Sequence, residues 1–304
     1  MKHIVSHYFK EEANLAAAPS EEKFPHQGIH YTDCHEPEFH GKPDALIPRF
    51  VGVEIEVDGT GAMQPNFYKL NQLVQKWHAY MDTDGSLSDG GFEMKTAPAT
   101  GAVFYEQVKE LCEELRSDRL RAYANSNCGL HNHVDVRELD EGNLPMIFES
   151  WVILQDMFYK MLPPQRRKNN YCYKIDDYNM PSFTPLHRAR VKAEIEDDKT
   201  IVSTLQNYAI KRAAQKGCGI NLSSWDYRST IEFRIPPGST NTNKIVGWAA
   251  LFSQFVNWFD ITSWAKKRRV LDMNHVDALR EAIWTPEANS FIDIRHKEYA
   301  KLDV

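Results

Sequence analysis

The sequence lacks the features that mark membrane, secreted and nucleic-acid-binding proteins. No run of about 18 apolar residues occurs in the 304-residue chain, so we expect no membrane span. The opening stretch MKHIVSHYFKEEANLAAAPS has neither the apolar block nor the cleavage site of a secretory signal. A formal net charge of −6 argues against non-specific binding to nucleic acid, which relies on a basic surface. We therefore expect a cytoplasmic protein.

Cysteine is also scarce, and its distribution argues against two further classes. The five cysteines are odd in number and widely scattered, and no two of them form a Cys-x-x-Cys pair. Neither a disulfide framework nor a structural zinc site is therefore predicted. The apolar content of 42% and the charged content of 26% are ordinary for a soluble globular enzyme.

The chain divides by composition into an arm, a main domain and a tail. Residues 1–45 are rich in His, Pro and Glu and predict an irregular arm. A zinc site on Cys34 and the neighbouring histidines is the alternative, but their spacing matches no standard ligand pattern, which favours a polar arm. The main domain is expected over residues 46–262, with a helical tail over 263–304 packed on the same domain.

Hydrophobic periodicity predicts alternating strands and helices in the main domain. The segment FVGVEIEVDG alternates strictly and ends in Asp-Gly, which is typical of a strand followed by a turn. Such an order of elements predicts an α+β fold with a mostly antiparallel sheet. The expected strands are residues 50–59, 90–97, 128–135, 217–225 and 229–238, and the expected helices are residues 66–81, 101–121, 143–161, 243–260 and about 275–284.

Four of these strands carry charged or imidazole side chains on one face and apolar side chains on the other. A solvated sheet face is the ordinary explanation for any single strand. Glutamate is a poor strand former, however, and carboxylates that face one another repel unless a cation lies between them. The four strands together therefore predict a divalent metal site, for which carboxylate ligands favour Mg²⁺ or Mn²⁺. The polar-face residues are Glu54, Glu56, Glu93, Lys95, His131, His133, Asp135, Glu232 and Arg234.

The segments that carry these residues resemble the amidoligase family. They read GVEIE, DGS…GFEMKTAP, CGLHNHVD, RRKNNYC, YAIKRAAQKGCGINLSSW and TIEFRIPPGSTNTNKIVGWAALF, and they extend roughly from Arg49 to Phe259. This family belongs to the glutamine synthetase and glutamate–cysteine ligase superfamily of carboxylate–amine ligases. The resemblance implies a curved antiparallel sheet whose open concave face holds ATP and Mg²⁺ or Mn²⁺, with helices packed on the convex side.

The resemblance also implies a role for each matching residue. Glu54 and Glu56 match paired glutamates that bind two different metal ions, and Glu93 matches a further metal ligand beside Glu56. His131 and Glu232 match the ligands that join Glu54 on the second metal ion. His133 matches a histidine near the nucleotide phosphates. Arg234 matches an arginine that contacts and stabilises the transferring phosphate.

The sequence departs from glutamine synthetase at one position of this pattern. Thr230 stands two residues before Glu232, where the glutamine synthetase strand has an arginine. Arg228 is one candidate substitute for that arginine, and Arg166 and Arg167 in PPQRRKNNYC are the others.

The activity implied is ATP-dependent amide-bond formation through an acyl phosphate, with small-molecule or peptide carboxylates and amines as substrates. The residues leave three alternatives open. His-x-His is a common ligand pair, so a metal-dependent hydrolase that uses His131 and His133 is one rival. A phosphotransferase on the same fold is the second, and a non-catalytic binding module is the third. Cys128 is interpreted as a small buried residue, and Asp135 has no assigned role.

Overall fold

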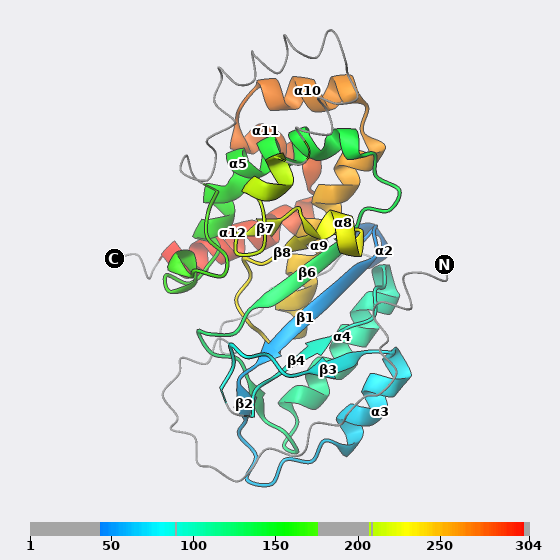
Figure 1. Ribbon diagram of the computed structural model, residues 1–304, viewed down its shortest axis with the longest axis vertical. Coiled ribbons are helices and arrows are strands. Elements are labelled where there is room, and N and C mark those ends of the chain that lie inside the picture. The colour runs from blue at the N-terminus through cyan, green and yellow to red at the C-terminus, as the bar shows by residue number, and fades with distance from the viewer. Residues whose placement is uncertain (1–42, 89, 176–206, 208, 301–304) are drawn as a thin grey trace. The chain divides into compact units, whose positions relative to one another are not determined.

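The computed structural model describes residues 43–88, 90–175, 207 and 209–300 (Figure 1). The arm predicted up to residue 42, its zinc alternative, and most of the polar segment that follows residue 175 lie outside the described residues. The chain forms two compact units. The first consists of Met1–Asn132 and Pro236–Ser253, and the second of His133–Ile235 and Gln254–Val304. Strand β6 (Leu130–Asp135) and helix α9 (Thr242–Ile261) each pass from one unit into the other.

The first unit is built on a sheet in which β1 is central. Its strand order is β3-β4-β1-β6, and both β1–β4 and β3–β4 pair in antiparallel fashion. The register places Glu54 opposite Lys95 and Glu56 opposite Glu93, so these side chains share one face. The strands are β1 (Val51–Val57), β3 (Tyr80–Asp82) and β4 (Phe92–Lys95), with a separate small ribbon of β2 (Gly59–Thr60) and β5 (Ala122–Tyr123).

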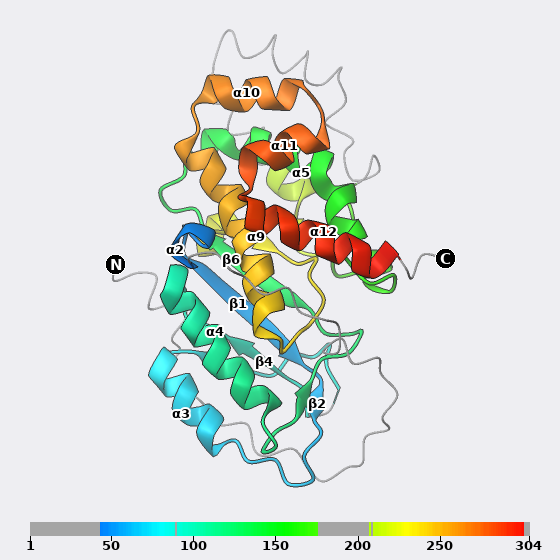
Figure 2. The same cartoon turned by 180° about the vertical axis from the view of Figure 1, so that it is seen from behind.

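Two helices cover one face of this sheet. Helices α3 (Tyr68–Trp77) and α4 (Gly101–Arg116) pack against each other, and short helix α2 (Pro43–Leu46) packs on α4. Figure 2 shows α3 and α4 in front of the strands, whereas Figure 1 shows the same strands from the opposite side with neither helix in front of them. The apolar stripe predicted for α4 is confirmed, because Phe104, Val108, Leu111 and Leu115 are all fully buried.

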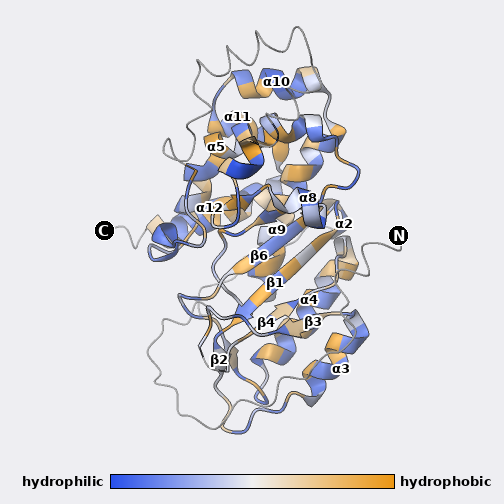
Figure 3. Cartoon of the chain, in the orientation of Figure 1, coloured by the Kyte–Doolittle hydropathy of each residue, from blue (hydrophilic) through white to orange (hydrophobic). Residues whose placement is uncertain are grey.

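The alternation along β1 explains which face the helices cover. Val53 and Ile55 point to the covered side and are almost completely buried. Each such side chain contributes about 1.5–3 kcal/mol on removal from water. Figure 3 shows the resulting succession of hydrophilic and hydrophobic residues along β1 and β6. The packing of the apolar side chains against the helices is therefore sufficient to fix the register of β1 and to direct its glutamates to the other face.

The described part of the second unit contains a short strand pair and several helices. Strands β7 (Ile220–Asn221) and β8 (Thr230–Phe233) pair antiparallel, with Asn221 opposite Glu232, and helix α8 (Ser224–Arg228) connects them. Trp151 stacks on Phe158 with ring centroids 5.0 Å apart, and Phe233 lies 5.7 Å from Trp151. The helices that pack on α5 (Leu144–Lys160) are α10 (Trp264–Asp272), α11 (Val276–Ile283) and α12 (Pro286–Ala300), and the short 3-10 turns are Glu141–Asn143 and Arg166–Lys168.

The mixed helix and sheet architecture and the mostly antiparallel open sheet are confirmed. The curved, glutamine synthetase-like sheet with a concave active-site face stays a prediction. The helix predicted over residues 66–81 is wrong at its end, because it stops at Trp77 and Tyr80–Asp82 form a strand instead. His78 has a left-handed backbone with φ 52°, which ends the helix. None of the helices in the described part of the chain is long and apolar enough to cross a membrane.

Candidate functional site

The polar face of the first unit's sheet is not a solvated surface. Glu54 is 8% exposed, and Glu56, Glu93 and His131 are each 5% exposed. Ionised carboxylates are almost never buried to this degree unless they are paired or bind a cation. The ordinary explanation of a wet sheet face therefore fails for these four residues, and their burial requires compensation by positive charge or protons.

The imidazole of His131 bridges the two glutamates of β1. Its Nδ1 lies 3.1 Å from Oε2 of Glu54, and its Nε2 lies 3.5 Å from Oε1 of Glu56. Glu56 is fixed from the other side, because its Oε2 accepts a hydrogen bond of 2.5 Å from the backbone N–H of Gly129. A neutral imidazole has only one N–H, so it presents a lone pair to one of the two carboxylates. A second proton or a metal cation is needed to make both contacts favourable.

Glu93 brings a third carboxylate to this cluster from strand β4. Burial and the charge of Glu54 raise the pKa of Glu93 to about 8, although the hydrogen bond and charge of Lys95 act to lower it. Ligand atoms of Glu54, Glu93 and His131 lie within 4.8 Å of one another. We call these three residues together with Glu56 the acidic cluster. Its composition of carboxylate oxygens and one imidazole is suited to a divalent ion with hard ligands.

Asp84 is a further member that the sequence analysis did not identify. Its carboxylate comes within 4.8 Å of ligand atoms of Glu56 and Glu93, which gives a second group of three possible ligands. Asp84 follows β3, and its Oδ1 accepts hydrogen bonds of 2.7 Å and 2.6 Å from the backbone N–H and hydroxyl of Ser86. The available signal was the motif DGS…GFEMKTAP, in which Asp84 precedes the strand that carries Glu93.

The second unit places His133 in a different environment. Its Nδ1 is 3.1 Å from Oγ1 of Thr230, and a guanidinium nitrogen of Arg228 is 3.2 Å from its Nε2. Arginine can only donate, so Nε2 accepts and the ring proton is on Nδ1, which donates to Thr230. The Thr230 hydroxyl is also 2.9 Å from Oγ of Ser224. Thr230, at the place of the missing arginine, thus fixes the histidine ring, while Arg228 brings its positive charge from helix α8.

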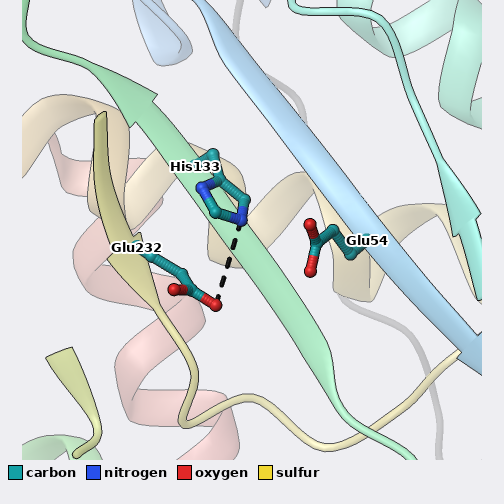
Figure 4. Close-up of side chains that lie close together, drawn as sticks. All are labelled: Glu54, His133 and Glu232. Carbon is teal, nitrogen blue, oxygen red and sulfur yellow. Dashed lines mark ion pairs between the residues drawn. The ribbon is translucent and has the colours of Figure 1, made fainter. Parts of the chain in front are cut away.

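Glu232 is the acidic residue of the second unit's site. Oε2 accepts a hydrogen bond of 2.7 Å from Asn221, and Oε1 is paired with the guanidinium of Arg234. Oε1 also lies 3.9 Å from Nε2 of His133, the pair joined by the dashed line in Figure 4. Glu232 and Arg234 are 4% and 7% exposed, so this charge pair is held away from water. The predicted metal group of Glu54, His131 and Glu232 is divided between the two units and stays a prediction.

The two arginines proposed from PPQRRKNNYC contact backbone carbonyl groups. Arg166 is buried and donates to the carbonyl oxygens of Arg234, at 2.8 Å, and Ile235, at 3.3 Å. Arg167 donates at 2.9 Å to the carbonyl oxygen of Leu162, just beyond helix α5. Arg166 therefore supports the segment that carries Arg234, and Arg167 supports the end of a helix. Of the candidates for the missing arginine, Arg228 contacts a predicted nucleotide-binding side chain, as described above for His133.

Asp135 and Cys128 have local structural partners. Both carboxylate oxygens of Asp135 bind Arg137, the shorter contact being 2.7 Å, so this aspartate closes the end of β6. Cys128 is buried, and its Sγ lies 3.6 Å from Oδ1 of Asn125. Cys128 is therefore buried as the sequence predicts.

The fold and the acidic cluster define a mixed α and β protein with a buried, carboxylate-rich site. The chain matches the family model described as "Putative amidoligase enzyme" over residues 68–256, more than half of its length, and it belongs to this family. The family name denotes a ligase. The match includes Glu93, His131, Glu232 and Arg234 but begins after β1, so that Glu54 lies outside it. No curated protein matches the chain.

Proposed function

We propose that the protein is an ATP-dependent carboxylate–amine ligase that works through an acyl phosphate. The observation that carries this proposal is the acidic cluster. Three buried carboxylates and an imidazole meet on the face that α3 and α4 leave uncovered, in a chain of the amidoligase family. Formation of an amide from a carboxylate requires an activated leaving group, and ATP supplies one in the form of a phosphoryl group.

The donor atoms of the cluster fit Mg²⁺ or Mn²⁺. Oxygen ligands of Mg²⁺ lie 2.0–2.1 Å from the ion, so opposite ligands are roughly 4.2 Å apart. Atoms that already lie within 4.8 Å of one another need only a small contraction to bind such an ion. Glu54, Glu93 and His131 would hold one ion, and Glu56, Asp84 and Glu93 would hold another. When bound, these ions would neutralise the negative charge on the β- and γ-phosphates of ATP.

The basic residues of the second unit would hold the nucleotide phosphates. Arg228 is exposed and adjacent to His133, whose ring is fixed by Thr230, and Arg234 is held in place by Glu232. In the first step an oxygen of the substrate carboxylate bonds to the γ-phosphorus and the bond to ADP breaks. In the second step the amine attacks the acyl carbon and phosphate leaves with that oxygen. No protein nucleophile is needed for either step.

The environment of His133 favours this function over a hydrolase that uses His131 and His133 as a ligand pair. A metal ligand must offer a nitrogen lone pair, and in His133 the Nε2 lone pair faces the guanidinium of Arg228 at 3.2 Å. A phosphotransferase differs from a ligase in a measurable way, because it consumes ATP with a phosphoryl acceptor alone.

The test is phosphate release from ATP with Mg²⁺, measured with a panel of small-molecule and peptide carboxylates and a panel of amines. We expect turnover that needs one carboxylate and one amine together, and loss of turnover in Glu54→Gln and Glu56→Gln. Arg137→Ala, which removes an exposed arginine that pairs with Asp135 outside the proposed site, is the matched control and should keep full activity. Unchanged turnover in either glutamine variant would exclude the proposed metal ligands. Absence of nucleotide binding together with tight binding of zinc would favour the hydrolase.

A further inference from the structure

Lys95 is a cation inside the acidic cluster that the proposed reaction does not use. It lies on β4 directly opposite Glu54, and its side chain points to the same face as that of Glu93, two residues earlier. Its Nζ is 2.8 Å from Oε2 of Glu93 and 3.6 Å from Oδ2 of Asp82. The side chain is only 23% exposed. An ammonium group therefore occupies part of the space around the carboxylate oxygens that would bind a metal ion.

The surroundings of Lys95 keep its ammonium group charged. Lysine is ordinarily charged at neutral pH, and here its ammonium group lies beside the carboxylates of Glu93 and Asp82. Lysine carries its charge at the end of a flexible four-carbon chain, so the group can change partners without movement of the strand. Glu93 and Asp82 stand opposite each other across β3 and β4, which gives Lys95 two carboxylates within reach.

We propose that Lys95 is a built-in cation of the acidic cluster: it stabilises the cluster without a bound metal ion, and its charge weakens binding of the divalent ion. The second part of this inference rests on the proposed function, because it assumes that the cluster binds Mg²⁺. The ammonium group and the metal ion compete for the carboxylate of Glu93, and two cations at such short distance repel each other. When Glu93 binds the metal ion, Lys95 keeps its contact with Asp82.

The test compares Lys95→Met with the wild-type protein in two measurements at pH 8.5, where protons compete least for the carboxylates. Methionine keeps the apolar stem of lysine and removes the charge. By titration calorimetry with Mg²⁺ alone, we expect at least about tenfold tighter binding in Lys95→Met, which is about 1.4 kcal/mol. By urea denaturation in EDTA, we expect a lower midpoint for Lys95→Met. Lys95→Arg should behave as wild type in both measurements.

A control separates the local effect from a change in net charge. Lys109→Met removes a lysine on α4 that is 42% exposed and lies 4.0 Å from Glu106, and it should alter neither quantity. Equal or weaker Mg²⁺ binding in Lys95→Met would overturn the inference that Lys95 weakens metal binding. An unchanged midpoint in EDTA would overturn its role in stabilising the metal-free cluster.

The double variant Glu93→Gln/Lys95→Met tests the charge balance even if Lys95→Met fails to fold. We expect the double variant to fold and to be more stable in EDTA than Lys95→Met, because the carboxylate that needs the ammonium group is gone. Failure of the double variant to fold would overturn the proposal, since Lys95 would then be required for packing. Absence of Mg²⁺ binding by the wild-type protein would instead contradict the proposed function, while the comparison in EDTA would still decide whether Lys95 stabilises the cluster.

Discussion

Glu93 makes the stability of the metal-free protein depend on pH in an unusual direction. Its pKa is raised to about 8 in the folded chain, from an ordinary value of 4.5. Between these values the folded state keeps a proton that the unfolded state has lost. The free energy of unfolding therefore falls as the pH rises, by up to about 1.4 kcal/mol per pH unit. Over the whole window the loss is about 3 to 5 kcal/mol, and at 5% exposure the side chain receives little screening from solvent.

Glu93→Gln removes this dependence, because glutamine has the shape of the neutral acid but no proton to lose. In EDTA at pH 5 the two proteins should have free energies of unfolding within about 1 kcal/mol of each other. At pH 8.5 the variant should be more stable than wild type by a few kcal/mol. Addition of Mg²⁺ at pH 8.5 should stabilise the wild type much more than the variant, since a bound ion stabilises only the protein that binds it. Urea denaturation at a series of pH values, with and without Mg²⁺, measures each quantity.

Parallel pH curves for wild type and Glu93→Gln in EDTA would refute the reasoning, because they would mean that Glu93 does not hold an additional proton in the folded state. Titrating groups outside the acidic cluster are common to both proteins and cancel in the difference. Equal stabilisation by Mg²⁺ would separately exclude Glu93 as a metal ligand.

Three further substitutions test other parts of the structure. Glu232→Ala removes the carboxylate paired with the buried guanidinium of Arg234 and should lower the free energy of unfolding by about 3–5 kcal/mol in urea denaturation; a loss below 1 kcal/mol would contradict the buried pair. Arg228→Ala should raise the KM for ATP at least about tenfold in steady-state kinetics. Its free energy of unfolding should change little, because an exposed arginine contributes little to stability. An unchanged KM would exclude Arg228 from nucleotide binding. Gly238→Ala would place a new Cβ 2.4 Å from Cβ of Cys128 and should cost about 1–3 kcal/mol in thermal denaturation; wild-type stability would contradict this close packing.

The long, strictly patterned elements could be predicted from the sequence alone. Strand β1 alternates valine or isoleucine with glutamate, and the periodicity of α4 places four apolar residues on one stripe, so each pattern dictates its own structure. Strand β3, in contrast, has three residues, and its pairing with β4 depends on a left-handed residue, His78, that local propensity does not specify. Short strands form because of their partners, and local propensity does not specify that pairing.

Helix α10 shows the same limit for a charged segment. The sequence KKRR has no apolar stripe. Arg268 has a local partner in Asp272, and the fold supplies distant partners as well. Nζ of Lys267 donates to Oδ1 of Asn143 at 2.7 Å, and Arg268 pairs with Glu149 at 3.0 Å. Both partners precede the helix by more than 100 residues along the chain, so their contribution could not be predicted from local sequence.

The acidic cluster lies between these extremes. The alternation of β1, β4 and β6 was enough to identify Glu54, Glu56, Glu93 and His131, because side chains of one parity share a face. The sequence could not show how deeply they are buried. Nor could it show that the ammonium group of Lys95 binds Glu93. Both the burial and this ion pair depend on how neighbouring strands are paired.

The transfer of ¹⁸O from a labelled carboxylate substrate to phosphate tests the proposed ligase reaction most directly. The experiment uses the carboxylate and amine that together support turnover of ATP. If the substrate carboxylate attacks the γ-phosphorus, one labelled oxygen leaves with each phosphate released, and mass spectrometry of the phosphate should detect it. Phosphate without label, or label in AMP, would contradict activation of the carboxylate as an acyl phosphate.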